Sequence, residues 1–166
     1  YVSKLSPYIR RRYISENKII GLISKRFKLN KVEKFIQEIF WRTYWRGWLE
    51  LHPQVYSEFQ NNIKTYEILN KTGIKCFDYW TDELIETGYL HNHARMWYAS
   101  IWIFTLKRRW EEGAHFFSDH LLDFCPASNT LGWRWVAGLQ TTGKHYLANA
   151  ENIKKFTNNR YYPLHQ

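Results

Sequence analysis

The chain has 166 residues, enough for one domain with a substantial core. Aromatic residues make up 19% of it, with nine Trp and twelve Tyr, and the formal net charge is +9. This charge favours an anionic partner such as nucleic acid, although a solvated basic face explains it equally well. Two cysteines are too few for a four-thiolate metal or iron–sulfur site, and they are not typical of a secreted disulfide framework.

The sequence shows neither a membrane span nor a signal peptide, so we expect a cytoplasmic protein. It begins with Tyr1 rather than Met, which leaves open whether the natural N-terminus is present. Only four Pro and eight Gly occur, and alternating strand-like runs are missing. We therefore expect an all-α fold, with residues 1–166 forming a single helical domain.

Helical patterns follow one another along the chain, separated by short polar loops. We expect helices over residues 8–12, 16–25, 31–50, 56–70, 77–86, 92–108 and 114–124, and a tail over residues 142–166 that mixes helical turns with loop. Ser6 is expected to cap the first helix, with Pro7 at its first position. Cys125 and Pro126 are expected to end the helix over residues 114–124.

The helix over residues 31–50 has two distinct faces. One stripe is expected to be ordinary core and consists of Phe35, Ile36, Ile39, Phe40 and Tyr44. The opposite stripe consists of Glu38, Trp41, Arg42, Trp45 and Trp48. A solvated face would not hold three tryptophans, and a core face would not hold unpaired charges. This stripe predicts a pocket lined by rings, the alternative being a helix between two layers with its charges paired elsewhere.

The helix that starts after His91 carries a similar face. Its members are Asn92, Met96, Ala99 and Ile103, with Arg95 on the flank. An amide, a thioether and a small residue together suit close approach to a flat ligand. The alternative is plain core packing with Asn92 as an N-cap.

The segment Asn129–Thr130–Leu131–Gly132–Trp133–Arg134–Trp135 follows Asp123 and a helix-breaking stretch. It places an amide and two tryptophans close together, which suits a redox cofactor that exchanges electrons through aromatic side chains. Three further motifs accompany it: Ser3–Lys4–Leu5–Ser6–Pro7, Glu38–Ile39–Phe40–Trp41–Arg42 and His91–Asn92–His93–Ala94–Arg95–Met96. In this order the four motifs resemble the FAD-binding, C-terminal half of the photolyase/cryptochrome superfamily, from Ser3 to about Thr157.

The resemblance implies an all-helical domain that binds FAD noncovalently in a bent shape. The implied cofactor residues are Ser3, Leu5 and Ser6 at the phosphates, Arg42 in the cavity, Arg95 and Asp123 as an ion pair beside the isoalloxazine ring, and Asn129 facing flavin N5. A Ser-rich loop that opens a helix suits phosphate, because free amides and the helix dipole favour an anion. An amide at N5 supports neutral or reduced flavin, as in photolyases, whereas animal cryptochromes usually have Cys there and plant cryptochromes Asp.

The resemblance also implies a substrate pocket of the kind that repairs cyclobutane pyrimidine dimers in DNA. Its residues are Glu38, Trp41, Asn92, Met96 and Trp135. The lesion is flipped out of the duplex, the two Trp stack on the pyrimidines, Asn92 and Glu38 bond their edges, and Met96 packs against them. The implied chemistry is light-driven electron donation from reduced flavin to the dimer, splitting of the ring and return of the electron.

Electron supply and DNA contacts complete the implied site. Trp133 and Trp110 match two members of the tryptophan chain that photoreduces the flavin. The third member has no counterpart, so either Tyr56, Tyr66 or another Trp replaces it or photoreduction is slow. Arg10–Arg12 and Lys107–Arg109 are expected to contact DNA phosphates.

The match also has departures. The family's α/β antenna domain has no counterpart before Tyr1, so we expect a fragment, a processed chain or a minimal form. Cys125 stands where the family has an acidic residue, and Lys4 and His93 replace common arginines. A flavin photoreceptor without repair activity and a non-enzymatic nucleic-acid-binding module remain alternatives, and the lesion type stays open.

We expect no metal site. His91 and His93 would point apart at a helical spacing of two residues. His115 and Asp119 form a helically compatible pair, for which a solvated or capping role is expected.

Overall fold

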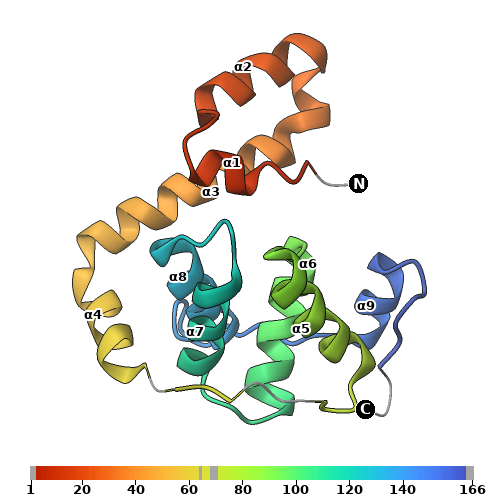
Figure 1. Ribbon diagram of the computed structural model, residues 1–166. Helices are drawn as coiled ribbons and strands as arrows, with labels where there is room; N and C mark the ends of the chain where they lie inside the picture. The colour runs from red at the N-terminus through yellow and green to blue at the C-terminus, as the bar shows by residue number, and fades with distance from the viewer. Residues whose placement is uncertain (1–2, 64, 68–70, 164–166) are drawn as a thin grey trace.

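The computed structural model describes residues 3–63, 65–67 and 71–163. Within these ranges the chain forms α-helices and one π-helical turn without any strand (Figure 1), which confirms the all-α prediction. The elements are α1 (Ser6–Arg10), α2 (Glu16–Arg26), α3 (Leu29–Leu51), α4 (Pro53–Asn62), α5 (Lys75–Thr87), α6 (Asn92–Ser100), η1 (Ile101–Thr105), α7 (Trp110–His120), α8 (Pro126–Val136) and α9 (Ala150–Phe156). None of the described helices is both long and apolar enough to cross a membrane.

Aromatic side chains fill the core between α5, α6, α7 and α8, which explains the unusual composition. Tyr98 stacks on Phe77 with ring centroids 4.1 Å apart, and Trp102 lies nearly parallel to Phe116 at 6.3 Å. All four rings are at least 98% buried. Burial of such large rings dominates core energetics, and offset or edge-on contacts add about 0.5–1.5 kcal/mol per pair.

A smaller cluster holds the N-terminal lobe together, which we define as residues 3–34. Ile9 of α1 and Ile19 of α2 pack on Ile39 of α3. Figure 1 shows this lobe standing out from the rest of the molecule, with α3 running from it down to α4. The lobe is joined to the body at α1, where Arg10 Nε donates a hydrogen bond to the carbonyl oxygen of Phe124.

Several helix boundaries differ from the sequence predictions. α1 begins at Ser6, its N-cap is Leu5, and no side chain caps it, so the predicted Ser6 cap is wrong. α7 runs over 110–120 rather than 114–124, with two glutamates in its first turn, where the helix dipole favours negative charge. Pro126 does not end a helix but starts α8, because its fixed φ and missing N–H suit the first helical turn.

The other differences lie in the middle of the chain. α6 ends at Ser100 and continues as the π-helical turn η1, in which Leu106 N bonds to Ile101 O at 2.9 Å. His91, not Asn92, is the N-cap of α6. The helix predicted over residues 56–70 starts earlier and ends at Asn62, while residues 64 and 68–70 of that prediction, like residues 164–166 of the predicted tail, lie outside the described residues.

Candidate functional site

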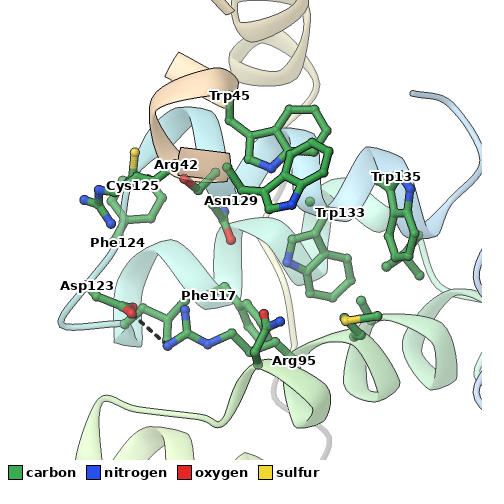
Figure 2. Close-up of a pocket in the computed structure, with 18 of the residues that line it drawn as sticks. Arg42, Trp45, Arg95, Phe117, Asp123, Phe124, Cys125, Asn129, Trp133 and Trp135 are labelled. Carbon is green, nitrogen blue, oxygen red and sulfur yellow. Dashed lines mark hydrogen bonds and ion pairs between the residues drawn. The ribbon is translucent and has the colours of Figure 1, made fainter. Parts of the chain in front are cut away.

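A cavity of about 470 Å³ lies between α3, α6 and α8, and Figure 2 shows its walls. This volume is in the range typical of small-molecule and cofactor sites. Its lining consists of Glu38, Trp41, Arg42 and Trp45 from α3; Asn92, Arg95, Met96 and Ala99 from α6; Phe117 from α7; Leu121, Asp123, Phe124 and Cys125 from the connection to α8; and Ser128, Asn129, Gly132, Trp133, Trp135 and Val136 from α8. Three motifs far apart in the sequence therefore meet at one site.

The α3 wall is the predicted aromatic stripe. Trp41 and Trp45 stack at 5.7 Å, while Trp48 lies outside the cavity and stacks on His52 at 4.0 Å. The other stripe was predicted to be core, and for Phe40 and Tyr44 this is wrong, since they are 56% and 53% exposed. The cluster that covers this side of α3 ends at Ile39, so the following turns have no layer against them.

An ion pair forms the polar end of the cavity. Arg95 Nη2 lies 2.9 Å from Asp123 Oδ2, and the two side chains are 24% and 4% exposed. Arg95 Nε donates to Leu90 O at 2.8 Å, which fixes the guanidinium against the start of α6. Asp123 Oδ1 is buried, and no hydrogen-bond partner for it exists among the described residues. This oxygen is an acceptor available to a ligand.

Asn129 projects from α8 into the cavity and is 8% exposed (Figure 2). Its Nδ2 donates to the carbonyl oxygen of Ala114 at 2.8 Å. This bond uses one of the two N–H groups of the amide and fixes its orientation. The amide oxygen can accept a hydrogen bond from a ligand.

Trp133 is fixed by a glycine of the neighbouring helix. Its ring lies so close to Gly113 of α7 that a Cβ added there would be 2.2 Å from Trp133 Cη2. The indole Nε1 is buried, and none of the described residues accepts its hydrogen bond. At Gly132, in contrast, an added Cβ would meet nothing within 4 Å. Gly113 thus leaves room for the ring of Trp133, and Gly132 leaves open space in the cavity wall.

Trp135 lies on the other side of the cavity from Asn129, as Figure 2 shows. It stacks on Tyr146 with ring centroids 5.5 Å apart. Trp133 instead contacts Phe117 at 5.1 Å and Trp102 at 6.3 Å. The spacing of two residues on α8 therefore turns the rings of Trp133 and Trp135 to different sides.

Cys125 also lines the cavity and has an unusual thiol. Burial alone would raise the pKa of Cys125, but hydrogen bonds from Ser128 and the charge of Arg42 lower it further than burial raises it. The net pKa of Cys125 is therefore below that of an ordinary cysteine, and its thiolate forms more readily.

Four residues predicted for the site do not line the cavity. Ser3, Leu5 and Ser6 lie at the start of α1, where Leu5 N donates to Ser3 Oγ at 3.4 Å. Trp110 stacks on Phe59 at 5.4 Å. Phe59 in turn lies 5.9 Å from Tyr56, so a phenylalanine separates the two oxidisable rings.

Some lining residues were not predicted from the sequence. They are Phe117, Leu121, Phe124, Ser128 and Val136. Phe117, Leu121 and Phe124 lie at the end of α7 and just beyond it. They could be assigned to the cavity only if the end of α7 at His120 had been predicted correctly. Ser128 and Val136 could have been predicted as lining residues, because a helix through the Asn129–Trp135 motif places them on the same face as Asn129 and Gly132.

The histidines behave differently from the prediction. His91 is the N-cap of α6 rather than a helical residue, so its ring stacks on that of His93 at 5.3 Å instead of pointing away. His115 Nε2 lies 3.7 Å from Asp119 Oδ1, which matches the predicted pair. Across the described ranges, no group of three or more His, Cys, Asp or Glu is placed to hold a metal.

Comparison with known proteins identifies the family. The sequence profile of the FAD binding domain of DNA photolyase matches residues 35–162. The chain belongs to this family. FAD is accordingly the cofactor of the domain, and the cavity fits it: two buried polar atoms without partners, on Asp123 and Trp133, and the open wall at Gly132 accommodate a flat ring system with polar edges.

Individual relatives are similar to this chain at moderate identity. The deoxyribodipyrimidine photo-lyase of Alkalihalophilus pseudofirmus is 28% identical, covering 87% of this chain and 33% of the relative. That of Escherichia coli is 29% identical over 68% of this chain and 26% of the relative. A solved class III photolyase from Agrobacterium tumefaciens superposes with a TM-score of 0.73 at 26% identity, covering 95% of this chain and 36% of that one. The chain spans between about a quarter and about a third of the length of these relatives.

Proposed function

We propose that this domain works in light-driven, FAD-dependent DNA repair and splits cyclobutane pyrimidine dimers. One observation carries the proposal: a single cavity gathers the five substrate residues expected from the sequence and the polar groups expected around the flavin. The relatives named above are photo-lyases, which supports the same activity.

The cavity has two chemically different ends, which suit two ligands. Arg95, Asp123 and Asn129 supply charge and an acceptor at one end. Trp41 and Trp135 supply ring faces at the other, and Trp41 is 49% exposed. When bound, FAD supplies light absorption and the electron for the reaction.

The aromatic end is our proposed lesion site. Trp41 and Trp135 would stack on the flipped pyrimidines and Met96 would pack against them. Exposed Glu38 and Asn92 would hydrogen-bond the edges of the bases. These groups orient the lesion and exclude water.

The polar end is our proposed flavin site, with Arg42 beside it and Ser3, Leu5 and Ser6 at the phosphates. Asn129 would hold a proton at flavin N5, because its amide oxygen can accept a hydrogen bond from that position while Ala114 fixes the orientation of the amide. That arrangement favours neutral or reduced flavin. Trp133 would pass electrons toward the cavity.

The test is repair by the full chain itself. Protein loaded with FAD and chemically reduced is illuminated with a thymine-dimer oligonucleotide, and dimer loss is followed by chromatography. We expect repair in the light only. Trp41→Phe should slow repair, whereas the matched control Trp48→Phe, outside the cavity, should leave it unchanged. Loaded protein that photoreduces without repair would instead support the photoreceptor alternative, and protein that refuses FAD yet binds DNA would support the binding module.

A further inference from the structure

The positive charge of the chain is concentrated in the N-terminal lobe. Residues 3–34 contain ten Lys and Arg against two carboxylates, whereas residues 35–166 contain fourteen against thirteen. The lobe therefore carries a net charge of +8, out of +9 for the chain. In the part of the lobe that the structure describes, Arg12–Glu16 at 3.3 Å is the one ion pair. Most of this charge is thus available to a partner.

Two of the lobe's lysines extend the cavity-lining face of α3. Lys31 and Lys34 are exposed and precede Glu38, Trp41 and Trp45 at alternating intervals of three and four residues. This spacing keeps all five on one side of the helix. At 1.5 Å per residue, Lys31 lies about 10 Å from Glu38 along the helix axis. The wall of the cavity therefore continues outward as a basic track.

The second basic segment, Lys107–Arg109, is largely neutralised within the body. Arg108 pairs with Glu112 at 3.3 Å, and its Nη1 donates to the carbonyl oxygen of Glu67. Arg109 pairs with Glu111, also at 3.3 Å. A phosphate would have to compete with these carboxylates, which it need not do at Lys31 and Lys34.

We propose that Lys31 and Lys34 form a phosphate track that holds the DNA strand leading away from the cavity; this inference rests on the proposed function. At about 3.4 Å per nucleotide along a duplex, the length from Glu38 to Lys31 spans about three nucleotides. Ammonium groups bind phosphates without reading sequence, so the track positions the strand and leaves lesion recognition to the cavity.

The experiment compares Lys31→Gln/Lys34→Gln with the control Lys71→Gln/Lys75→Gln, in which Lys71 is already paired with Asp82 at 2.9 Å. Both pairs remove two charges, but the control pair lies at and just before the start of α5, outside the cavity lining. Affinity for a fluorescein-labelled, dimer-containing duplex is measured by anisotropy between about 50 and 200 mM salt. In the Lys31→Gln/Lys34→Gln variant, the fall of log K with log salt should become less steep, by about 1.8 in the slope. Binding should weaken roughly 10- to 50-fold near 0.1 M salt. The control should match the wild-type slope.

Equal slopes for the two variants would overturn the track, as would wild-type protein that does not bind DNA. So would lysine-dependent binding to anionic phospholipid vesicles with unchanged DNA affinity. Failure of the proposed function gives a different result, in which DNA binding depends on Lys31 and Lys34 but light repairs no dimer. FAD loading, followed by absorbance, should be unchanged in both variants.

Discussion

Two glycines of the cavity region allow the same substitution to be tested in opposite environments. Gly113 lies in α7 and Gly132 in α8, and an alanine at either position gains helix propensity of about 1 kcal/mol. At Gly132 the new methyl group meets nothing within 4 Å, whereas at Gly113 it would lie 2.2 Å from the buried ring of Trp133.

The expected stabilities follow from these surroundings. Gly132→Ala should stabilise the free protein by about 1 kcal/mol, or about 2–4 °C in Tm for a chain of this size. For Gly113→Ala the same gain is opposed by an overpacking cost of up to about 3 kcal/mol. The overpacking cost is expected near about 3 kcal/mol, because the rigid ring of Trp133 cannot move aside as a flexible side chain can. The net loss is about 2 kcal/mol, or about 4–8 °C.

Thermal unfolding with and without FAD measures both effects. At a fixed concentration, a ligand that binds more tightly raises Tm more. The methyl group of Gly132→Ala enters the cavity, so FAD should raise the Tm of this variant less than that of wild type. Equal Tm shifts of the same sign for the two variants would refute the packing argument at Gly113. An undiminished FAD effect in Gly132→Ala would refute the placement of the flavin against α8.

Three further predictions concern other residues of the site. Asp123→Ala should destabilise the protein by about 3 kcal/mol in urea unfolding, because it leaves a half-buried arginine without its partner; a loss below about 1 kcal/mol, as for a surface pair, would contradict this. Iodoacetamide should label Cys125 and not Cys76, because the pKa of the Cys125 thiol is lowered while burial raises the pKa of Cys76 to about 11. The labelling rate should rise with pH and level off below the pKa of free cysteine, and FAD should block it; peptide mass spectrometry gives the site, and labelling of Cys76 would contradict the assignment. Phe59→Trp should speed light-driven reduction of bound FAD, followed by loss of its absorbance, since it places an oxidisable ring against Trp110; an unchanged rate would exclude this route.

The helical fold and the α3 wall of the cavity could be predicted from local patterns, whereas the grouping of the other site residues came from the resemblance to the photolyase/cryptochrome superfamily. The spacing of Glu38, Trp41 and Trp45 along one helix face depends only on helix geometry, and the structure brings these residues to one wall. Exposure of Phe40 and Tyr44 could not be predicted this way, because it depends on which neighbouring helix covers that face and where this cover ends. Long-range contacts of this kind leave no mark in the periodicity of a single helix.

The wrong N-cap predicted for the first helix also arises from contacts that the local sequence does not show. Ser6 and Pro7 fit a helix start, but the chain begins the helix one residue earlier, and the lobe rather than a cap holds α1. The π-helical turn after Ser100 is equally invisible, since its sequence reads as a continuous helix.

The Asn129–Trp135 motif shows how positions outside the cavity control those inside it. Asn129 points its oxygen into the cavity because Ala114 holds its nitrogen, and Trp133 keeps its place because Gly113 leaves room for the ring. Both restraints come from adjacent residues of α7, which do not line the cavity. The α7–α8 contact therefore fixes both the acceptor proposed for flavin N5 and the ring proposed to supply electrons. It follows that a substitution at Gly113 should disturb FAD binding and photoreduction together, although Gly113 itself does not line the cavity.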